Sequence, residues 1–362
     1  MYRVWKSRAG KRKLRSKQVC ELRIGGFCSI KVAFGHKMRI RTLEGITFDA
    51  QVDTSILESA LATGHTYEYS CKNGQCGVCK ATLIEGEVGE LQAQYALTEE
   101  DKAKNEILTC CTVPKTDVLL DIKELGALKD IVVKTLPARI NQITKHSEHI
   151  VEIDLRLPPT ANFKFLEGQF IDVLGPAGVR RSYSIASCAD EKVIKLMIKK
   201  VKQGVLSQYW FEQAKINDLL RFEGPKGTFF FREKCKKIVC LATGTGIAPI
   251  KAILDRLDQQ HGCGNKLQVA LYWGNRSRED FFWQPSWENL NVDYHPVLSR
   301  GDDNWQGRVG YVQDVAEADI QDYNDTEVYV CGSLQMIESA KEVLMARGLP
   351  DTHFYADAFV SS

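Results

Sequence analysis

The chain has 362 residues, of which 44% are hydrophobic and 26% charged, and its formal net charge is +2. This length allows two or three domains of ordinary size, and the composition is that of a globular protein. The small net charge gives no argument for a nucleic-acid partner, and no run approaches the ~20 apolar residues that a membrane span needs.

Residues 1–36 differ from the rest because the first seventeen carry eight Lys or Arg and no apolar stretch follows them, so they do not read as a signal peptide. Three interpretations are open: a disordered tail, an organelle-targeting segment, or an extension upstream of a start at Met38. We favour the extension, with a disordered tail next. No function is assigned to this segment.

Twelve cysteines raise the question of the redox compartment. A secreted disulfide framework is not expected, because the chain is large, lacks a signal peptide and groups several cysteines as in a metal site. Reduced cysteines in the cytoplasm fit better, and we expect a cytoplasmic protein.

The segment from residue 37 to 128 alternates short strands and turns. The pattern predicts a hairpin over Thr42–Val52 and a short helix over Ser55–Thr63, with Asp53 or Thr54 as its cap. A cysteine-rich loop follows the helix and leads into another strand. We expect a small α+β domain here.

Two further domains are predicted after it. Residues 129–232 contain short β patterns at the spacing of an antiparallel barrel, namely Val132–Ile140, His149–Leu155, Gln169–Val173, Arg181–Ala186 and Val193–Val201. In residues 233–362, apolar strands alternate with helical stretches, which predicts a parallel α/β sheet. The strands are Ile238–Leu241, Leu267–Trp273, Tyr294–Val297 and Glu327–Val330, and the helices include Pro249–Leu257 and Met336–Ala346.

The cysteine-rich loop has the spacing of an iron–sulfur site. Cys71, Cys76 and Cys79 form a C-x4-C-x2-C run, and Cys110 and Cys111 follow about thirty residues later. This is the spacing of plant-type [2Fe–2S] ligands, whose soft thiolates hold iron in both redox states. A structural zinc site usually pairs two C-x2-C knuckles, and only one occurs here.

The segment Tyr69–Cys79 resembles the plant-type ferredoxin loop along its whole length. In that family the fourth ligand lies in a Leu-Thr-Cys sequence, which implies Cys110 here, with Cys111 as the competitor. Gly74 and Gly77 between the ligands allow tight turns that aim backbone N–H groups at the sulfurs.

A flavin motif is found in the middle region. Arg181-Ser182-Tyr183-Ser184 resembles the R-x-Y-S motif of the ferredoxin–NADP reductase superfamily. An Arg can pair with a phosphate, a Tyr can cover the isoalloxazine face and a Ser hydroxyl can reach a ring nitrogen. Tyr183 and Ser184 are therefore also candidate catalytic residues. By analogy with such reductases FAD is preferred over FMN.

Two more segments follow in the order of that superfamily. Gly204 and Ser207 form a G-x-x-S step that resembles the second flavin segment, where a helix N-terminus faces the pyrophosphate. Gly224–Gly227 resembles the G-P-x-G turn that closes the flavin domain. Three motifs in the order of the superfamily are more specific than any one of them.

The third region carries a nicotinamide motif. The strand Ile238–Leu241 runs into a glycine-rich turn that resembles the superfamily's G-T-G-I-A-P loop. Such a turn lets a pyrophosphate approach the backbone. The candidate binding residues are Gly244, Thr245, Gly246 and Pro249.

Three further positions are implied by the same resemblance. Cys331 and Gly332 belong to a C-G-x-x-x-M segment whose cysteine lies beside the nicotinamide, so Cys331 is a candidate catalytic residue. Arg276 ends a G-x-R string on the adenosine side, and Phe359 can lie against the flavin. NADH is favoured over NADPH because of the reductase subfamily that the chain resembles most.

The complete order of ferredoxin, flavin barrel and nucleotide domain resembles the reductase components of bacterial oxygenases. The terminal His353–Phe359 string and the Thr109-Cys110-Cys111 sequence are more similar to the CDP-6-deoxy-Δ-3,4-glucoseen reductase family. That resemblance implies electron transfer from NADH through FAD and a [2Fe–2S] cluster to a protein acceptor. The acceptor would be the iron–sulfur dehydratase of 3,6-dideoxyhexose synthesis for surface polysaccharide. The alternatives are an oxygenase component as acceptor, or a flavin- and cluster-binding redox sensor.

Overall fold

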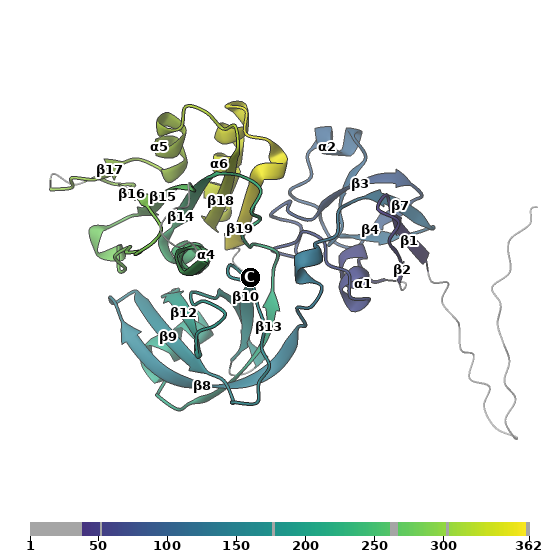
Figure 1. The fold of residues 1–362 in the computed structure, drawn as a ribbon. Coiled ribbons are helices and arrows are strands. Elements are labelled where there is room, and N and C mark those ends of the chain that lie inside the picture. Colours follow the sequence, from purple (N-terminus) through teal and green to yellow (C-terminus); the bar gives the residue numbers. More distant parts are fainter. Residues whose placement is uncertain (1–37, 51–52, 176–177, 261–266, 302–303, 360–362) are drawn as a thin grey trace, which may run out of the picture.

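The computed structural model describes residues 38–50, 53–175, 178–260, 267–301 and 304–359. They form an N-terminal module on a mixed sheet, a six-stranded antiparallel barrel and a C-terminal parallel α/β module, so the expected fold classes are confirmed. Figure 1 shows the barrel below the α/β module and the N-terminal module beside both. The expectations for residues 1–36 lie outside the described residues.

The N-terminal module is built on a five-stranded sheet of order β2-β1-β7-β3-β5. Its strands are β1 (Met38–Thr42), β2 (Thr47–Ala50), β3 (Lys80–Glu85), β5 (Glu106–Leu108) and β7 (Val118–Asp121). The predicted hairpin is present, since β1 pairs antiparallel with β2. A smaller sheet pairs β4 (Val88–Glu90) with β6 (Thr112–Pro114).

Helix α1 (Ile56–Ala62) begins one or two residues later than the predicted caps. Its N-cap is Ser55, whose extended backbone lets the side-chain oxygen accept the Glu58 N–H at 3.1 Å. The buried face of the helix packs on the core of the sheet, which includes Ile40 and Phe48. Helix α2 (Glu99–Ala103) carries a capping box, and the 3₁₀ turn η1 (Gly126–Leu128) ends the module.

The barrel has strand order β11-β10-β13-β8-β9-β12, and a bridge between Ile185 and Leu196 brings its two edge strands together. Its strands are β8 (Lys134–Lys145), β9 (Ile150–Arg156), β10 (Phe170–Leu174), β11 (Arg180–Ser184), β12 (Val193–Lys199) and β13 (Leu219–Lys226). Strand β13 was not predicted. Gly224 pairs with Lys134 and Lys226 with Phe170, so most of the expected closing turn is the end of this strand.

The α/β module is a sheet of order β17-β16-β15-β14-β18-β19 in which each pair is parallel. Its strands are β14 (Lys237–Thr243), β15 (Gln268–Asn275), β16 (Val292–Leu298), β17 (Arg308–Val309), β18 (Thr326–Ser333) and β19 (Phe354–Phe359). The continuous apolar runs of β14 and β18 fit strands that are covered on both faces.

Helix α4 (Ile247–Gln260) packs in one hydrophobic core of this module, and α5 (Val312–Asp319) and α6 (Leu334–Ala346) pack in the other. The first strand, β14, runs directly into the 3₁₀ turn η4 (Gly244–Gly246) and then into α4. The carboxyl ends of the parallel strands therefore gather at one edge of the sheet. That edge is where ligands bind in open α/β sheets.

Candidate functional site

The cysteine loop lies between α1 and β3, and it brings four thiols together in two pairs. The Sγ of Cys71 accepts the Cys76 backbone N–H at 3.3 Å, and the Sγ of Cys79 lies 3.3 Å from the Sγ of Cys110. Cys79 and Cys110 are buried, while Cys71 and Cys76 are partly exposed. The four predicted ligands therefore converge, although Cys110 comes from the turn after β5.

Cys111, the competing fourth ligand, lies beside Cys110. Its Sγ lies 3.4 Å from the Sγ of Cys110 and 3.7 Å from the carbonyl oxygen of Ala93. A Cβ placed on Gly74 would come within 2.9 Å of this sulfur. Cys111 thus lies near Gly74, Ala93 and Cys110, whereas a bond to the Cys79 sulfur is found for Cys110. This arrangement supports Cys110 as the ligand.

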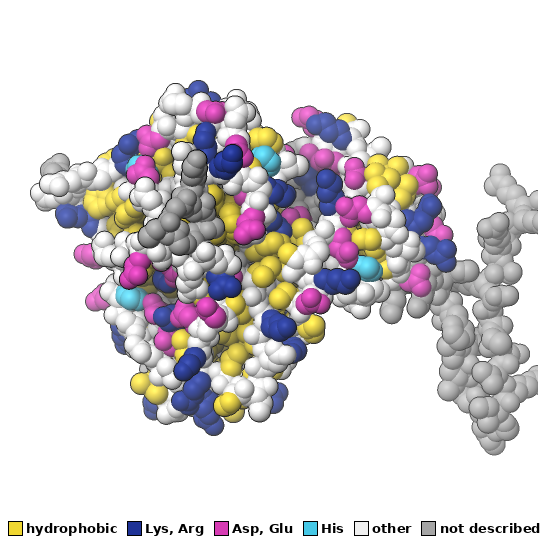
Figure 2. Space-filling view, viewed as in Figure 1, with side chains coloured by type: hydrophobic (Ala, Val, Ile, Leu, Met, Phe, Trp, Pro, Cys, Tyr) yellow, Lys and Arg dark blue, Asp and Glu magenta, His cyan; other side chains and the backbone are white. Residues whose placement is uncertain are grey.

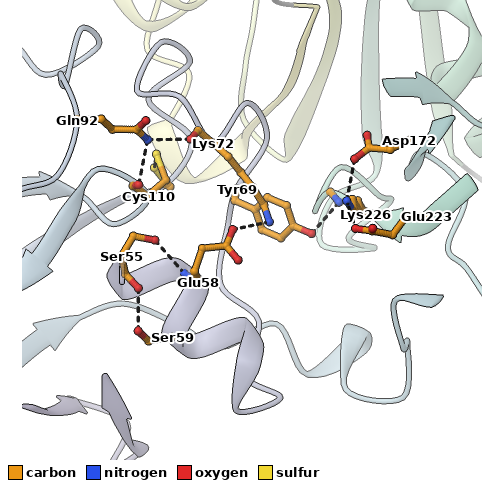
Figure 3. A network of polar contacts seen from close by, with 12 residues as sticks. Ser55, Glu58, Ser59, Tyr69, Lys72, Gln92, Cys110, Asp172, Glu223 and Lys226 are labelled. Carbon is orange, nitrogen blue, oxygen red and sulfur yellow. Dashed lines mark hydrogen bonds and ion pairs between the residues drawn. The ribbon is translucent and has the colours of Figure 1, made fainter. Parts of the chain in front are cut away.

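A second segment covers the cysteine loop closely. Gly74 has φ +79°, and a Cβ at this position would meet the Ala93 carbonyl oxygen at 2.2 Å, so only glycine fits. The Gln92 amide donates to the carbonyl oxygens of Lys72 and Cys110 at 2.9 and 3.1 Å, as Figure 3 shows. These bonds hold the loop and the distant Cys110 in one unit.

Thiols arranged in two pairs suit a two-iron cluster. Within the described ranges, no three His, Cys, Asp or Glu side chains form a group that could hold one metal ion. A [2Fe–2S] cluster takes two cysteines per iron, which matches two pairs. The hydrogen bond between the two thiols lowers the pKa of Cys71 and raises that of Cys76, and backbone N–H groups of the loop also lower the pKa of Cys71.

The R-x-Y-S motif forms β11, at the edge of the barrel next to β10. Ser184 is buried, and its hydroxyl lies 3.5 Å from a carboxylate oxygen of Asp357. The Tyr183 hydroxyl accepts the Trp210 indole N–H at 3.0 Å, and burial raises the pKa of this tyrosine to about 12. Ser182 donates to Asp172 at 2.6 Å. Tyr183 is therefore held rigidly and stays protonated.

The other flavin candidates lie on the same barrel. Arg181 is exposed on β11, where a phosphate can reach it. Gly204 caps the short helix α3 (Val205–Gln208) without a side-chain hydrogen bond, which leaves N–H groups for an acceptor. The Ser207 hydroxyl accepts the Val201 N–H at 2.7 Å and keeps its own hydrogen to donate. These groups suit an anionic cofactor such as FAD.

The G-T-G turn sits at the strand-end edge of the α/β sheet. The Trp273 indole N–H donates to the Gly244 carbonyl at 2.9 Å, which fixes the turn. A Cβ on Gly246 would come within 2.3 Å of the carbonyl oxygen of Cys331, so the turn packs directly on β18. Pro249 is buried in the first turn of α4.

A cavity of about 710 Å³ opens beside this turn. Gly244, Thr245, Arg276 and Phe359 from the predicted set line it, together with residues of α5 and α6. Cys331 and Gly332 lie behind it on β18, and burial raises the pKa of the Cys331 thiol. The volume is that of a pocket for a cofactor-sized ligand.

Two residues that the sequence analysis missed point into this cavity. Asn275 and Gln313 are 5% and 6% exposed and line the cavity. Both amide atoms of Asn275 and the amide oxygen of Gln313 have no hydrogen-bond partner in the described structure. Buried polar groups without partners are costly, so these amides fit a polar ligand such as a dinucleotide. Asn275 is the middle residue of the G-x-R string that ends in Arg276, whereas Gln313 belongs to no motif found in the sequence.

Asp357 is a third missed residue, and it lies where the sites meet. It is fully buried on β19, beside Cys331 in the parallel register, and its second oxygen accepts the Ser70 hydroxyl at 2.9 Å. Burial raises the pKa of Asp357 to about 6. The one sequence signal was an acidic residue between two alanines in the last strand. The candidate nucleotide, flavin and cluster sites thus adjoin one carboxylate.

Family models match all three modules. The 2Fe-2S iron-sulfur cluster binding domain matches residues 41–115, the oxidoreductase FAD-binding domain residues 137–231 and the oxidoreductase NAD-binding domain residues 240–342. The expected cofactor classes are thereby confirmed. No helix among the described residues is long and apolar enough to cross a membrane.

The chain is similar to reductases over nearly its whole length. It is 42% identical to the CDP-6-deoxy-L-threo-D-glycero-4-hexulose-3-dehydrase reductase of Yersinia pestis, over 88% of this chain and 97% of the relative. It is 38% identical to the RfbI protein of Salmonella typhimurium, over 88% and 94%. The anthranilate 1,2-dioxygenase electron transfer component of Acinetobacter baylyi is 28% identical, over 90% and 98%.

Solved structures show the same fold. A cytochrome P450 reductase from Amycolatopsis aligns with a TM-score of 0.69 at 24% identity, over 90% of this chain and 99% of that one. The ferredoxin reductase of a carbazole 1,9a-dioxygenase aligns with a TM-score of 0.62 at 25% identity, again over 90% and 99%. The three-module architecture is therefore that of electron-transfer reductases.

Proposed function

Because the chain belongs to the iron–sulfur flavoprotein reductase family of the CDP-6-deoxy-L-threo-D-glycero-4-hexulose-3-dehydrase reductases, we propose that its acceptor is a dehydrase of that kind. The electron donor in this proposal is NADH. The observation that carries it is the 42% identity over 97% of such a reductase, against 28% for the oxygenase component from Acinetobacter baylyi.

Each module has a role in this reaction. Bound FAD would supply the chemistry that links a two-electron hydride donor to a one-electron cluster, and the barrel residues would hold it. The cavity beside Gly244 binds the nucleotide, and Asn275 and the amide oxygen of Gln313 bring buried polar groups without a partner in the described structure to its lining. Joining the modules in one chain keeps their effective concentration high.

The residues around the flavin position it and exclude water. Tyr183, fixed by Trp210, covers one face, and Ser184 offers a buried hydroxyl whose hydrogen is shared with Asp357. Arg181 and the N–H groups after Gly204 bind phosphate. Cys331 is a neutral, fully buried thiol behind the nucleotide turn, and it packs the nicotinamide end of the site.

The four thiols hold the cluster. Cys71 and Cys76 form one pair and Cys79 and Cys110 the other, and backbone N–H groups of the loop donate to the Cys71 sulfur. Hydrogen bonds of this kind stabilise added negative charge on the sulfurs. The hydrogen bonds of the loop would therefore stabilise the reduced form of a bound cluster.

The test is anaerobic turnover with candidate acceptors. NADH oxidation by the holoenzyme should accelerate when a CDP-6-deoxy-4-hexulose 3-dehydrase and its sugar nucleotide are added together, and should not respond to the sugar nucleotide alone. Acceleration by an oxygenase component but not by the dehydrase would show that the acceptor is an oxygenase component. Slow NADH oxidation with every acceptor, artificial ones included, would refute both and favour the redox sensor.

A further inference from the structure

Three consecutive residues before the first cluster cysteine each bond to another part of the molecule. Glu68 pairs with Arg232, which follows the barrel, at 2.8 Å. Tyr69 bonds to the two residues that follow β13, and Ser70 bonds to β19. All three precede Cys71 directly. The loop that carries the cluster ligands is thus itself attached to both other modules.

The Glu68 contact is an ion pair that is buried on the arginine side, while the Glu68 side chain is 37% exposed. The Arg232 side chain is only 6% exposed, and its guanidinium also donates to the Thr228 carbonyl at 2.6 Å. The guanidinium carbon lies 3.6 Å from the centroid of the Phe230 ring. A guanidinium stacked on an aromatic ring and paired with a carboxylate is a specific, directional contact. This ion pair connects the cysteine loop to the segment that follows the barrel.

Tyr69 inserts between the modules. Its hydroxyl accepts the Gly227 N–H at 3.0 Å, and its own N–H donates to the Thr228 hydroxyl at 2.9 Å. The Thr228 hydroxyl lies within donating distance of the Tyr69 carbonyl and of the Glu68 carboxylate, at 2.9 and 2.8 Å. Figure 3 shows Tyr69 pointing from the cysteine loop toward the strand end that carries Lys226.

Ser70 makes a further buried contact. Its hydroxyl donates to Asp357 at 2.9 Å, and both residues are less than a tenth exposed. The other oxygen of the same carboxylate faces the Ser184 hydroxyl of the flavin motif at 3.5 Å. One side chain therefore joins the cluster loop to the flavin strand. Breaking the hydrogen bond between Ser70 and Asp357 leaves buried polar groups unpaired, which lowers the free energy of unfolding.

We propose that Glu68, Tyr69 and Ser70 form a docking segment that fixes the cluster beside the flavin, with Ser70 as a positioning residue that acts through Asp357. This proposal rests on the electron transfer described above and deepens it. Contacts between domains of one chain are by default mobile. Here a buried hydrogen-bond network restricts that mobility. Because the rate of electron transfer falls steeply with distance, the fraction of molecules in which the segment is docked sets the rate of electron transfer from flavin to cluster.

The test separates flavin reduction from cluster reduction. The holoenzyme is mixed anaerobically with NADH in a stopped-flow instrument, and freeze-quenched samples give the paramagnetic signal of the reduced cluster. In Ser70→Ala the loss of one buried hydrogen bond should slow cluster reduction by about fivefold or more. The rate of flavin bleaching by NADH should stay at the wild-type value.

A matched control and a conservative variant isolate the docking role. Ser59→Ala removes a hydroxyl that is equally buried in the same module but bonds to Ser55 within it, and it should leave both phases unchanged. Asp357→Asn keeps an oxygen that accepts the Ser70 hydroxyl and should retain faster cluster reduction than Asp357→Ala. Combining Ser70→Ala with Asp357→Ala should slow this phase no further than Asp357→Ala alone.

A second measurement does not depend on turnover. In hydrogen exchange on the oxidised holoenzyme, peptides that contain the Tyr69 and Gly227 N–H groups should exchange faster in Ser70→Ala than in Ser59→Ala. If Ser70→Ala fails to assemble its cofactors, Asp357→Ala, which leaves the cysteine loop intact, carries the same test.

Equal cluster-reduction rates and equal exchange in Ser70→Ala and Ser59→Ala would overturn the docking role. That result leaves the electron path untouched, provided that the wild type reduces its cluster. A wild-type enzyme that never reduces its cluster with NADH would instead refute the electron path, and the docking proposal with it. The two failures are therefore distinguishable.

Discussion

Replacing Asp357 by Asn should change how the stability of the protein depends on pH. Burial raises the pKa of Asp357 from its ordinary 3.8 to about 6, although hydrogen bonds from Ser70 and Ser184 partly offset the shift. A shift of this size corresponds to about 3 kcal/mol that the folded state loses once the carboxyl ionises. A nearby cysteine thiolate acts in the same direction as burial.

The sign follows from the protons bound in each state. Between pH 3.8 and about 6 the folded protein keeps the Asp357 proton while the unfolded chain has released it. Stability therefore falls as pH rises through this window, and the effect is complete above the folded pKa. Between pH 5 and pH 8 the wild type should lose about 1.4 kcal/mol of unfolding free energy relative to Asp357→Asn.

The assay is denaturant unfolding of both holoproteins at pH 5 and pH 8, followed by tryptophan fluorescence. Every other titrating group is common to the two proteins, so the difference between them isolates residue 357. Parallel pH dependences would refute the reasoning. A wild type that gains stability over Asp357→Asn at the higher pH would show that the ionised carboxylate is paired rather than merely buried.

Three further predictions test the sites separately, two of them with a matched control variant. Cys110→Ser should lower the iron and sulfide content and the visible absorption of the cluster, whereas Cys111→Ser should leave them unchanged. Asn275→Ala should raise the KM for NADH about tenfold with kcat nearly constant, measured with ferricyanide, because a buried amide that pairs only with the nucleotide is lost. Gly246→Ala places a Cβ 2.3 Å from a carbonyl oxygen and should cost about 1–3 kcal/mol of unfolding free energy, whereas Gly126→Ala, with no atom within 4 Å, should be nearly neutral.

The features predicted from sequence are those in which the chemistry is local. The cysteine spacing, the Arg-x-Tyr-Ser strand and the Gly-Thr-Gly turn each bring their groups together within a few residues, so the backbone alone determines their geometry. Strand positions in the α/β module were also predictable because covered parallel strands are continuously apolar. Strand β13 (Leu219–Lys226) was missed, since it ends in a Gly-Pro pair that is typical of a turn.

The features that were missed depend on contacts between distant parts of the chain. Asn275 is the last residue of β15 and lies two residues beyond the predicted strand Leu267–Trp273, and Gln313 lies in helix α5, which was not predicted. Their unpaired amides appear as a site only when both face one cavity. From the sequence, Cys110 could be preferred over Cys111 only by resemblance. The two cysteines are neighbours in the chain, and their spacing to the other ligands does not show which side chain points toward them. The observed 3.3 Å approach to Cys79 supplies that direction.

The position of Asp357 follows from the order of the sheet. Strand β19 is the last in the chain and pairs in parallel with β18, which places Asp357 beside Cys331. The same strand lies at the sheet edge that the N-terminal module approaches, so Ser70 reaches one carboxylate oxygen while Ser184 approaches the other. The space-filling view in Figure 2 shows the N-terminal module packed against the rest of the molecule. A carboxylate buried among three modules costs stability, and its retention there is best explained if the contact that it makes serves electron transfer.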